Sequence, residues 1–344
     1  MSRHPLRVPA ADLVETVERD PALWNELQGA HVFLTGGTGF FGCWLLEALV
    51  WARTSFGIDV SVTVLTRDAG RFRRRTGDLG DEPALSLVAG DVRTFDFPAG
   101  TFSHVIHAAA ESSKSLPADE TWQTVVDGTS RVLEFARTHG ARKFLFVSSG
   151  AVYGPQPASL SHVSEDGVGG PPADSSSVYG EAKRAAELVS IQNAERSTFE
   201  VQIARCFAFV GPHLPLDAHF AIGNFIRDAL SGARIHLRGD GTAVRSYLYA
   251  ADLAIWLITI LTRGEPSRAY NVGSEEAISV FELARLVAAQ LRPGLDIEIT
   301  GPPSSGPPDR YVPSTRRARQ ELGLASTVSL ADAIRRTAAW HRGI

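Results

Sequence analysis

The chain contains little cysteine. Only two of its 344 residues are cysteine, Cys43 and Cys206, and two cannot build the disulfide framework of a small secreted domain. They form no CxxC pair and belong to no Cys/His cluster, so the sequence indicates no metal site. We expect both thiols to be buried and chemically inert.

Long apolar runs and an excess of one charge are also missing. No apolar stretch reaches the length of a membrane-spanning helix. The first residues, MSRHPLRVPAADLVETVERD (1–20), mix both charge signs and lack the apolar centre of a signal peptide. Lys and Arg number 34 against 38 Asp and Glu, which leaves no broad basic field. We therefore expect a cytoplasmic protein whose main partners are neither membrane nor nucleic acid.

From His31 onwards, short β-branched and aromatic runs alternate with longer helical stretches. The runs that have the pattern of strands buried on both faces lie at 31–35, 60–66, 85–90, 104–108, 143–149 and 199–206. Helical stretches lie between several of them, at 43–53, 124–138 and 179–192. This alternation predicts an α/β fold with a Rossmann-like, doubly wound parallel sheet.

The first of these strands ends in TGGTGFFG (35–42), with three glycines spaced three apart before a helix. Gly36 can take the tight turn because it lacks a Cβ, Gly39 lets the backbone approach a pyrophosphate, and Gly42 lets the helix pack on the strand. The helix N-terminus offers free N–H groups to the anion. The turn therefore predicts a dinucleotide site, whose expected contacts here are Gly36, Thr38, Gly39, Phe40, Phe41 and Gly42.

The end of the second strand bears on the choice between NAD and NADP. An acidic residue there would bind the adenosine ribose hydroxyls and favour NAD, but Thr66 and Arg67 occupy that neighbourhood. The guanidinium of Arg67 could hold a 2′-phosphate, which favours NADP. Asp68 stands close enough to reach the ribose after a small change of register, so NAD stays open. We expect the basic run RFRRR (71–75) to be a solvated face.

Three further residues form a candidate proton-transfer site. Tyr179 and Lys183 are four apart, so a helix places them on one face. A nearby ammonium stabilises a phenolate and lowers the tyrosine pKa, which suits Tyr179 as general base. Ser149, at the end of a neighbouring strand, can hydrogen-bond the same substrate oxygen. The three predict proton transfer at an alcohol carbon that also gives up a hydride.

With these motifs the chain resembles the extended short-chain dehydrogenase/reductases, in particular the nucleotide-sugar epimerase/dehydratase family, from residue 31 to about 340. SSGAVYG and YGEAK match the motifs of the catalytic Ser149, Tyr179 and Lys183, and the resemblance implies that Tyr179 and Lys183 also contact the cofactor. GDV (90–92) looks like the adenine-side motif, and HAAAESS (107–113) resembles the loop over the nicotinamide ribose. The contacts that these two motifs imply are Asp91, Val92, Ala108 and Ala109.

The resemblance also implies substrate contacts and an assembly. IARCFAFVGP (203–212) resembles the segment that leads into the substrate domain. GDGTAVRSYLYAADLA (239–254) resembles the stretch whose arginine, here Arg245, contacts the nucleotide diphosphate. DRYVP (309–313) makes Arg310 a second phosphate candidate, and Asn224 is a further candidate for the substrate. The implied partner is a nucleotide-diphosphate sugar, and the implied oligomer is a homodimer built through 124–138 and 179–192.

On this basis the chain divides into three parts. Residues 1–30 are expected to be an N-terminal helical extension packed on the main domain. Residues 31–210 are expected to form the NAD(P)-binding Rossmann domain, with a return segment near 245–265. Residues 211–344, which are richer in Pro and Gly, should be mainly the smaller, mixed nucleotide-sugar-binding domain over the strand ends.

Three departures from the family pattern narrow the reaction. Sugar 4,6-dehydratases carry an acidic pair just after the catalytic serine or threonine, where this chain has Gly150 and Ala151. Decarboxylases of UDP-glucuronate also use a glutamate there. Val125 stands where the family often has asparagine, and Ala208 stands where an asparagine commonly touches the substrate. The sugar contacts should therefore differ from those of the best-known members.

The sequence thus favours a nucleotide-sugar epimerase that inverts carbon 4 through a transient 4-keto sugar, because Ser149, Tyr179 and Lys183 suffice for that reaction. An NADPH-dependent 4-keto reductase is the alternative, supported by Arg67. A sugar 4,6-dehydratase and a noncatalytic dinucleotide-sensing module are less favoured. The glycine turn alone would serve a sensor, which needs neither Tyr179 nor Lys183.

Overall fold

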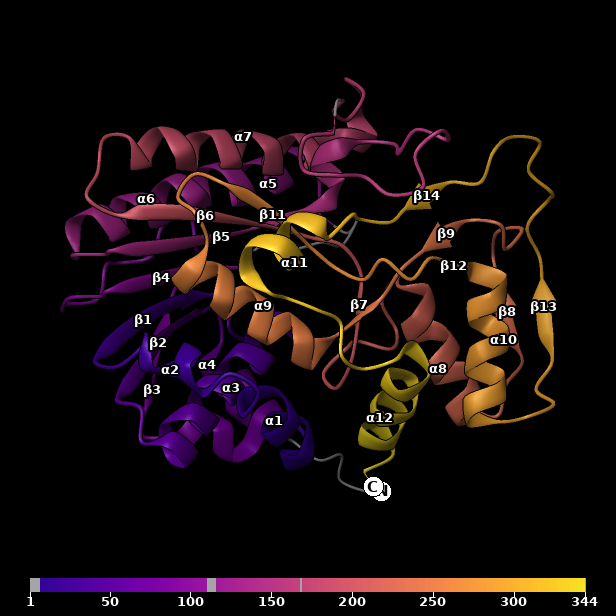
Figure 1. Cartoon of the computed structure of the whole chain (residues 1–344), viewed down its shortest axis with the longest axis horizontal. Helices are drawn as coiled ribbons and strands as arrows, with labels where there is room; N and C mark the ends of the chain where they lie inside the picture. The colour runs from indigo at the N-terminus through magenta and orange to yellow at the C-terminus, as the bar shows by residue number, and fades with distance from the viewer. Residues whose placement is uncertain (1–6, 110–115, 168, 344) are drawn as a thin grey trace.

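The computed structural model describes residues 7–109, 116–167 and 169–343. Seven parallel strands form its main sheet, in the order β11-β6-β5-β4-β1-β2-β3 (Figure 1). They are β1 (Ala30–Thr35), β2 (Val60–Thr66), β3 (Leu85–Ala89), β4 (His104–His107), β5 (Lys143–Ser149), β6 (Glu200–Cys206) and β11 (Ala269–Val272). The order runs outward from β1 on both sides, so the predicted Rossmann-like, doubly wound sheet is confirmed.

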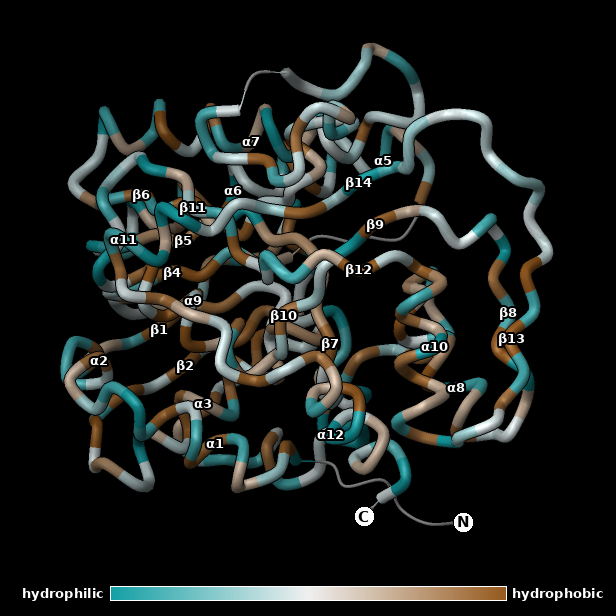
Figure 2. The backbone as a smooth tube through the Cα atoms, turned by 45° about the vertical axis from the view of Figure 1, so that its right-hand side comes forward, coloured by the Kyte–Doolittle hydropathy of each residue, from teal (hydrophilic) through white to brown (hydrophobic). Residues whose placement is uncertain are grey.

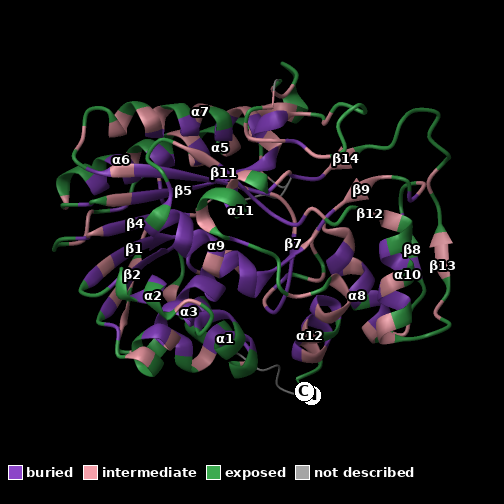
Figure 3. Ribbon diagram, in the orientation of Figure 1, coloured by how far each residue is buried: buried purple, intermediate pink, exposed green. Residues whose placement is uncertain are grey.

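Helices cover both faces of this sheet. On one face lie α1 (Ala10–Val17), α2 (Pro21–Asn25), α3 (Phe40–Phe56) and α9 (Ala250–Arg263), and on the other lie α6 (Gly128–Thr138) and α7 (Val178–Ala194). Successive side chains of a strand point to opposite faces, so Val32 and Leu34 join one hydrophobic cluster while Phe33 joins the other. The strands are accordingly apolar and buried (Figures 2 and 3).

Shorter elements complete the large lobe. Helix α4 (Ala69–Thr76) follows β2, and α5 (Ala118–Trp122) leads into a π-helical turn at Gln123–Asp127 before α6. Single 3-10 turns lie at Gly77–Asp81, Gly150–Tyr153 and Ser175–Ser177. The turn at 150–153 directly follows β5, so it brings the segment after Ser149 back beneath α7.

Three small sheets and their helices form the second lobe, on the right of Figure 1. The paired strands are β7 (Phe209–Val210) with β10 (Leu248–Tyr249), β8 (Ile235–Leu237) with β13 (Ile297–Ile299), and β9 (Val244–Arg245) between β12 (Ile278–Ser279) and β14 (Arg310–Tyr311). The helices are α8 (Ala221–Ser231), α10 (Val280–Leu291), α11 (Arg316–Leu322) and α12 (Leu330–Arg342). Strand β9 therefore holds Arg245 and Tyr311 in register with each other.

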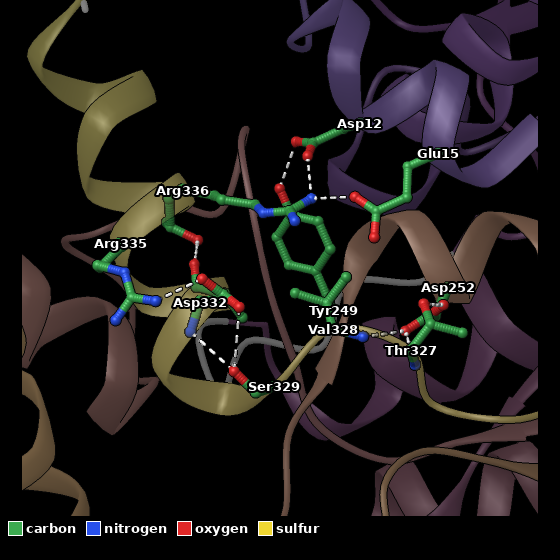
Figure 4. Close-up of polar contacts among 12 residues, drawn as sticks. Asp12, Glu15, Tyr249, Asp252, Thr327, Val328, Ser329, Asp332, Arg335 and Arg336 are labelled. Carbon is green, nitrogen blue, oxygen red and sulfur yellow. Dashed lines mark hydrogen bonds and ion pairs between the residues drawn. The ribbon is translucent and has the colours of Figure 1, made fainter.

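Polar contacts tie the N-terminal helix to the second lobe (Figure 4). The buried carboxylate of Asp12 in α1 accepts hydrogen bonds from the Tyr249 hydroxyl at 2.5 Å and from Arg336 of α12 at 2.6 Å. Arg336 also donates to Glu15 at 2.7 Å. Two donors offset the cost of burying the Asp12 charge. Helix α1 therefore contacts residues from the far end of the chain.

Two sequence expectations concern burial. Cys43 and Cys206 are both free and buried, as expected. Burial raises the pKa of the Cys43 thiol to about 11, which keeps it protonated at neutral pH. No helix in the described part of the chain is long and apolar enough to cross a membrane.

Candidate active site

The glycine turn lies between β1 and α3, against the backbone that follows β4. Gly36 has a φ of +72°, and a Cβ on it would lie 2.4 Å from the carbonyl oxygen of Ala108. A Cβ on Gly42 would lie 2.3 Å from the backbone of Gly37. The turn therefore accepts no side chain at either glycine. The N-terminus of α3, which begins at Phe40, borders this tight backbone cradle, and that arrangement fits a dinucleotide pyrophosphate.

A chain of hydrogen bonds lies beneath the loop after β4. The Thr35 hydroxyl is 2.7 Å from Nδ1 of His107, and Nε2 of His107 is 3.0 Å from the Thr129 hydroxyl. The backbone N–H of Ala109 donates to Thr35 Oγ1 at 3.1 Å. Burial lowers the pKa of His107 to about 3, so the imidazole is neutral. These contacts fix Ala109 beside the turn; residues 110–113 of the HAAAESS motif lie outside the described residues.

The residues after β2 are arranged differently from the sequence expectation. Arg67 is exposed, and the carboxylate of Asp68 caps α4 by accepting the backbone N–H of Arg71 at 2.8 Å. Arg75, from the basic run that was expected to be a solvated face, donates to the carbonyl of Thr38 and to Cys43 Sγ at 3.2 Å. That expectation was wrong for Arg75, because α4 turns this side chain back onto the glycine turn.

The predicted adenine-side residues lie at the end of β3. Asp91 accepts two hydrogen bonds from the guanidinium of Arg93, at 2.8 and 3.0 Å, and this partner holds the pKa of the Asp91 carboxyl below its usual range. Val92 is buried, and a Cβ on Gly128 would lie 2.9 Å from its Cγ1. The first turn of α6 therefore packs closely on Val92. Contacts from Asp91 and Val92 to an adenine stay predictions.

The structure brings Ser149 and Tyr179 together, at the end of β5 and the first turn of α7. Burial raises the pKa of Tyr179 to about 12, and the hydrogen bond with Ser149 acts in the opposite direction. The Ser149 hydroxyl also accepts the backbone N–H of Ala151 at 3.1 Å. Ser149 thus favours the ionised form of Tyr179, a part that the sequence argument gave to Lys183.

Lys183 is buried one turn further along α7. Its ammonium donates to the carbonyl of Val147 at 2.7 Å and lies 4.7 Å from the centre of the Phe146 ring. Burial lowers the pKa of Lys183 to about 8, so the group keeps much of its charge at neutral pH. In this structure Lys183 is held by the β5 backbone, and its expected contacts with Tyr179 and a cofactor ribose stay predictions.

Two aromatic rings that sequence reasoning did not select cover the segment after Ser149. A Cβ on Gly150 would lie 2.7 Å from Phe207 and 2.8 Å from the Tyr311 hydroxyl. The centres of these two rings are 4.6 Å apart. The Tyr311 hydroxyl is 3.5 Å from Ser149 Oγ. Residue 150 is therefore glycine at a place where side chains from β14 and the β6–β7 connection fill the space above the backbone.

The candidate substrate residues are only partly brought together. Arg245 lies beside Tyr311 in the β9–β14 ladder and pairs with the Asp309 carboxylate at 2.6 Å. Arg310 is half-buried and lies opposite Val244 in the same ladder. Asn224 lies elsewhere, on α8. Its side-chain oxygen accepts from Arg227 at 2.9 Å, and it lines a cavity of about 530 Å³ between α8 and β8. A larger hollow of about 690 Å³, between α10 and α12, is lined by none of these residues.

A buried polar network supports the end of β5 from behind. The Glu187 carboxylate of α7 accepts from Ser148 at 2.5 Å and from Arg205 of β6 at 2.7 Å. Arg205 also donates to the Tyr153 hydroxyl at 2.9 Å, which donates to Asn271 at 2.8 Å. The network joins β5, β6, β11 and α7 around Ser149. An arginine inside an otherwise apolar strand was the sequence signal that pointed to it.

Metal ligation was not expected. Among residues 7–109, 116–167 and 169–343, no group of three or more His, Cys, Asp or Glu side chains could hold a metal ion. The titratable groups at the site are instead the phenols of Tyr179 and Tyr311 and the ammonium of Lys183.

A doubly wound sheet with a glycine turn after β1, a serine ending β5 and a YxxxK helix defines an extended short-chain dehydrogenase/reductase. The chain belongs to the NAD dependent epimerase/dehydratase family, whose family model matches residues 32–273. The family expected from the motifs is thereby confirmed.

Curated relatives cover most of the chain. A dTDP-glucose 4,6-dehydratase from Streptomyces griseus is 30% identical over 334 residues, which span 90% of this chain and 94% of the relative. A UDP-glucuronic acid decarboxylase 2 from Arabidopsis thaliana is 29% identical over 306 residues, which span 88% of this chain and 66% of the relative. The chain is thus similar to members with two different named activities.

Solved structures show the same fold. A dTDP-glucose 4,6-dehydratase from Streptomyces venezuelae, with NAD and TYD bound, is 26% identical with a TM-score of 0.77 and covers 91% of this chain and 97% of its own. A UDP-N-acetylglucosamine 4-epimerase from Methanobrevibacter ruminantium M1 is 20% identical with a TM-score of 0.79 and covers 91% of this chain and 98% of its own. One backbone therefore serves several named reactions.

Proposed function

We propose that this chain is an NAD(P)-dependent nucleotide-sugar epimerase that inverts carbon 4 of its sugar through a transient 4-keto sugar. The observation that carries the proposal is the segment after Ser149. It holds Gly150 and Ala151 in place of proton-transferring side chains, and Phe207 and Tyr311 fill the space above Gly150. Water loss needs an acid and a base there, whereas epimerisation needs only Ser149, Tyr179 and Lys183.

The chain's own residues handle the proton. Tyr179 takes the proton of the sugar 4-hydroxyl and returns it when the alcohol re-forms on the other face. Ser149 orients that hydroxyl and stabilises the charge that develops on its oxygen. Lys183 supplies a buried positive charge within the same helix turn as Tyr179, which favours a phenolate. A bound nicotinamide dinucleotide would supply hydride acceptance and hydride return.

The residues proposed to hold that dinucleotide follow the turn and its surroundings. Gly36, Gly39 and Gly42 give the close backbone approach, and Thr38, Phe40 and Phe41 complete the turn. Asp91, Val92, Ala108 and Ala109 are proposed on the adenine and nicotinamide sides. We further propose a preference for NADP, with Arg67 on the 2′-phosphate; support comes from its exposure and from the use of Asp68 as a helix cap.

The substrate is proposed to be a nucleotide-diphosphate sugar. Arg245 and Arg310 would bind the diphosphate from the β9–β14 ladder, and Asn224 would contact the nucleotide from the cavity at α8. Support comes from the solved relatives, whose names include UDP-glucose and UDP-N-acetylmuramic acid complexes. We also propose a homodimer through α6 and α7, because Leu188 on α7 is 57% exposed and Trp122 on the adjacent α5 is 42% exposed.

A 4-keto nucleotide-sugar reductase is the alternative. The same three residues serve it, and a preference for NADP would favour it because a reductase consumes its cofactor. A 4,6-dehydratase is less favoured despite the 30% identical relative, since Gly150 and Ala151 cannot move protons. A noncatalytic dinucleotide sensor is also less favoured, because it does not need Tyr179 and Lys183.

The first experiment is a panel of nucleotide hexoses, hexuronates and heptoses, incubated without added reduced cofactor. We expect one member to be converted to its 4-epimer, with product in large excess over enzyme. Formation of a 4-keto-6-deoxy sugar would instead mean that an acid and a base come from elsewhere in the chain. Conversion of only 4-keto sugars, with one NADPH oxidised per product, would replace the epimerase by the reductase.

A further inference from the structure

Tyr311 lies in the catalytic cluster although it comes from the last strand of the second lobe. It ends β14, and its hydroxyl is 3.5 Å from Ser149 Oγ. Ser149 is also hydrogen-bonded to Tyr179, so one serine hydroxyl stands between two phenols. Tyr311 comes 132 positions after Tyr179 in the numbering and is brought here by the β9–β14 pairing next to Arg245.

The place of the Tyr311 hydroxyl is specific. It stands 2.8 Å from the position that a Cβ on residue 150 would take. The Tyr311 ring is fixed from one side by Phe207, with ring centres 4.6 Å apart. Residue 150 follows the catalytic serine directly, so the phenol occupies the space into which a side chain at 150 would project. A proton-bearing group is therefore present at this point, supplied by β14 instead of by residue 150.

The hydrogen bonds of this phenol are incomplete. Its two partners are Ser149 Oγ and the carbonyl of Cys206, both at 3.5 Å. Good O–H···O bonds are about 2.7–2.8 Å long, so neither contact satisfies the group fully. Burial raises the pKa of Tyr311, which keeps the phenol protonated at neutral pH. It therefore offers one proton to the cluster.

Counting donors and acceptors indicates where that proton goes. A serine hydroxyl accepts two hydrogen bonds and donates one. Ser149 Oγ already accepts the backbone N–H of Ala151 at 3.1 Å. If it also accepts from Tyr311, its acceptor sites are filled and its own proton is directed at Tyr179. The proton of Ser149 then stabilises the phenolate of Tyr179.

We propose that Tyr311 is a positioning residue, which donates to Ser149 and through it lowers the proton affinity of Tyr179. The proposal rests on the proposed function only in taking Tyr179 as the base that accepts a sugar hydroxyl proton. No bond other than O–H is made or broken: the proton leaves the sugar oxygen and joins the Tyr179 oxygen, while Tyr311 keeps its own.

The test is a pH titration of tyrosine ultraviolet absorbance, in protein saturated with oxidised dinucleotide. Subtracting the curve of Tyr179→Phe isolates the ionisation of Tyr179. In Tyr311→Phe, which keeps the ring, this transition should move upward by about 0.5 to 1 pH unit, a loss of about three- to tenfold in acidity expected for one relayed hydrogen bond. Tyr311→Leu, which also lacks the hydroxyl, should give a shift in the same direction.

Two controls separate this role from packing. On a Ser149→Ala background, Tyr311→Phe should cause no further shift, because the coupling runs through Ser149. Tyr270→Phe removes another buried phenol, whose hydroxyl bonds to Glu321 at 3.0 Å, and should leave the Tyr179 transition unchanged.

The direction of the shift decides the outcome. An unchanged transition in Tyr311→Phe would overturn the proposal. A downward shift would overturn it too, since that result means Tyr311 accepts from Ser149 and competes for its proton. The titration needs no sugar, so failure of the epimerase proposal and failure of this one are distinguishable.

Discussion

At the residue scale, the proton chemistry depends on a few hydroxyls whose ionisation is set by their surroundings. The phenol of Tyr179 is raised in pKa by burial and is favoured as phenolate by Ser149. Lys183 adds a buried charge that burial has brought to a pKa of about 8. A base of this kind works only when neighbours offset the cost of burying its charge.

Removal of the Tyr179 hydroxyl tests this assignment. Tyr179→Phe should reduce kcat by roughly two to four orders of magnitude, the scale of lost general base catalysis. Dinucleotide binding, measured by fluorescence titration, should be retained because the glycine turn is untouched. Tyr270→Phe is the matched control and should keep wild-type turnover. Wild-type turnover by Tyr179→Phe on a verified substrate would show that another group is the base.

Motif spacing predicted some residues of the site and missed others for a physical reason. Ser149, Tyr179 and the glycines stand in local patterns whose spacing already implies their geometry. Tyr311 and Phe207 belong to no local pattern, and only the pairing of β14 with β9 brings Tyr311 to Gly150. Non-local contacts of this kind leave no periodic signal in the sequence.

At the element scale, the turn from β2 into α4 controls what faces the cofactor turn. Asp68 is used as the helix cap, which leaves Arg67 exposed at the strand end. Arg75, two turns into α4, donates to the carbonyl of Thr38 in the glycine turn. The two arginines therefore have separate expected roles. Arg67 would select the cofactor, and Arg75 would hold the turn.

Titration of purified apoprotein with NADPH and NADH distinguishes these roles. The wild type should prefer NADPH, and Arg67→Ala should reduce that preference by about ten- to a hundredfold, the loss of one charge-assisted contact. Arg75→Ala should weaken both cofactors alike. Arg73→Ala, whose partner is the exposed Asp81 at 3.1 Å, should change neither. Equal or tighter NADH binding by the wild type would instead indicate NAD as the cofactor.

Elements with a strong apolar pattern were predicted closely. The runs at 60–66 and 143–149 coincide with β2 and β5, because strands buried on both faces carry continuous apolar sequence. Strand β11 was not predicted as a strand, and two-residue strands such as β9 and β14 are too short for any period. Arg75 was misassigned because a basic run alone does not reveal which side chain a helix turns inward.

At the scale of the whole molecule, one hydrophobic cluster runs from Leu13 of α1 through β1 to Ile334 of α12. The first and last helices also meet through Asp12 and Arg336. The division near residue 210 into two binding domains stays a proposal, since a continuous core joins both sides of it.

The exposed apolar side chains at α5 and α7 predict a dimer. Sedimentation velocity of the wild type should give twice the mass of one chain, and Leu188→Glu should shift the protein towards monomer because a buried charge opposes the contact. Leu160→Glu is the matched control, since Leu160 is 37% exposed in a loop outside these helices. A monomeric wild type at micromolar concentration would contradict the proposed assembly.

The most direct test of the epimerase account follows the hydrogen at carbon 4. The substrate found in the panel is labelled there with deuterium and incubated with enzyme and an excess of unlabelled NADPH. The account predicts a 4-epimer that retains the deuterium, because the same hydride returns to the same sugar, with no net change in nicotinamide absorbance. Product that has lost the label, with one NADPH oxidised per turnover, would contradict it.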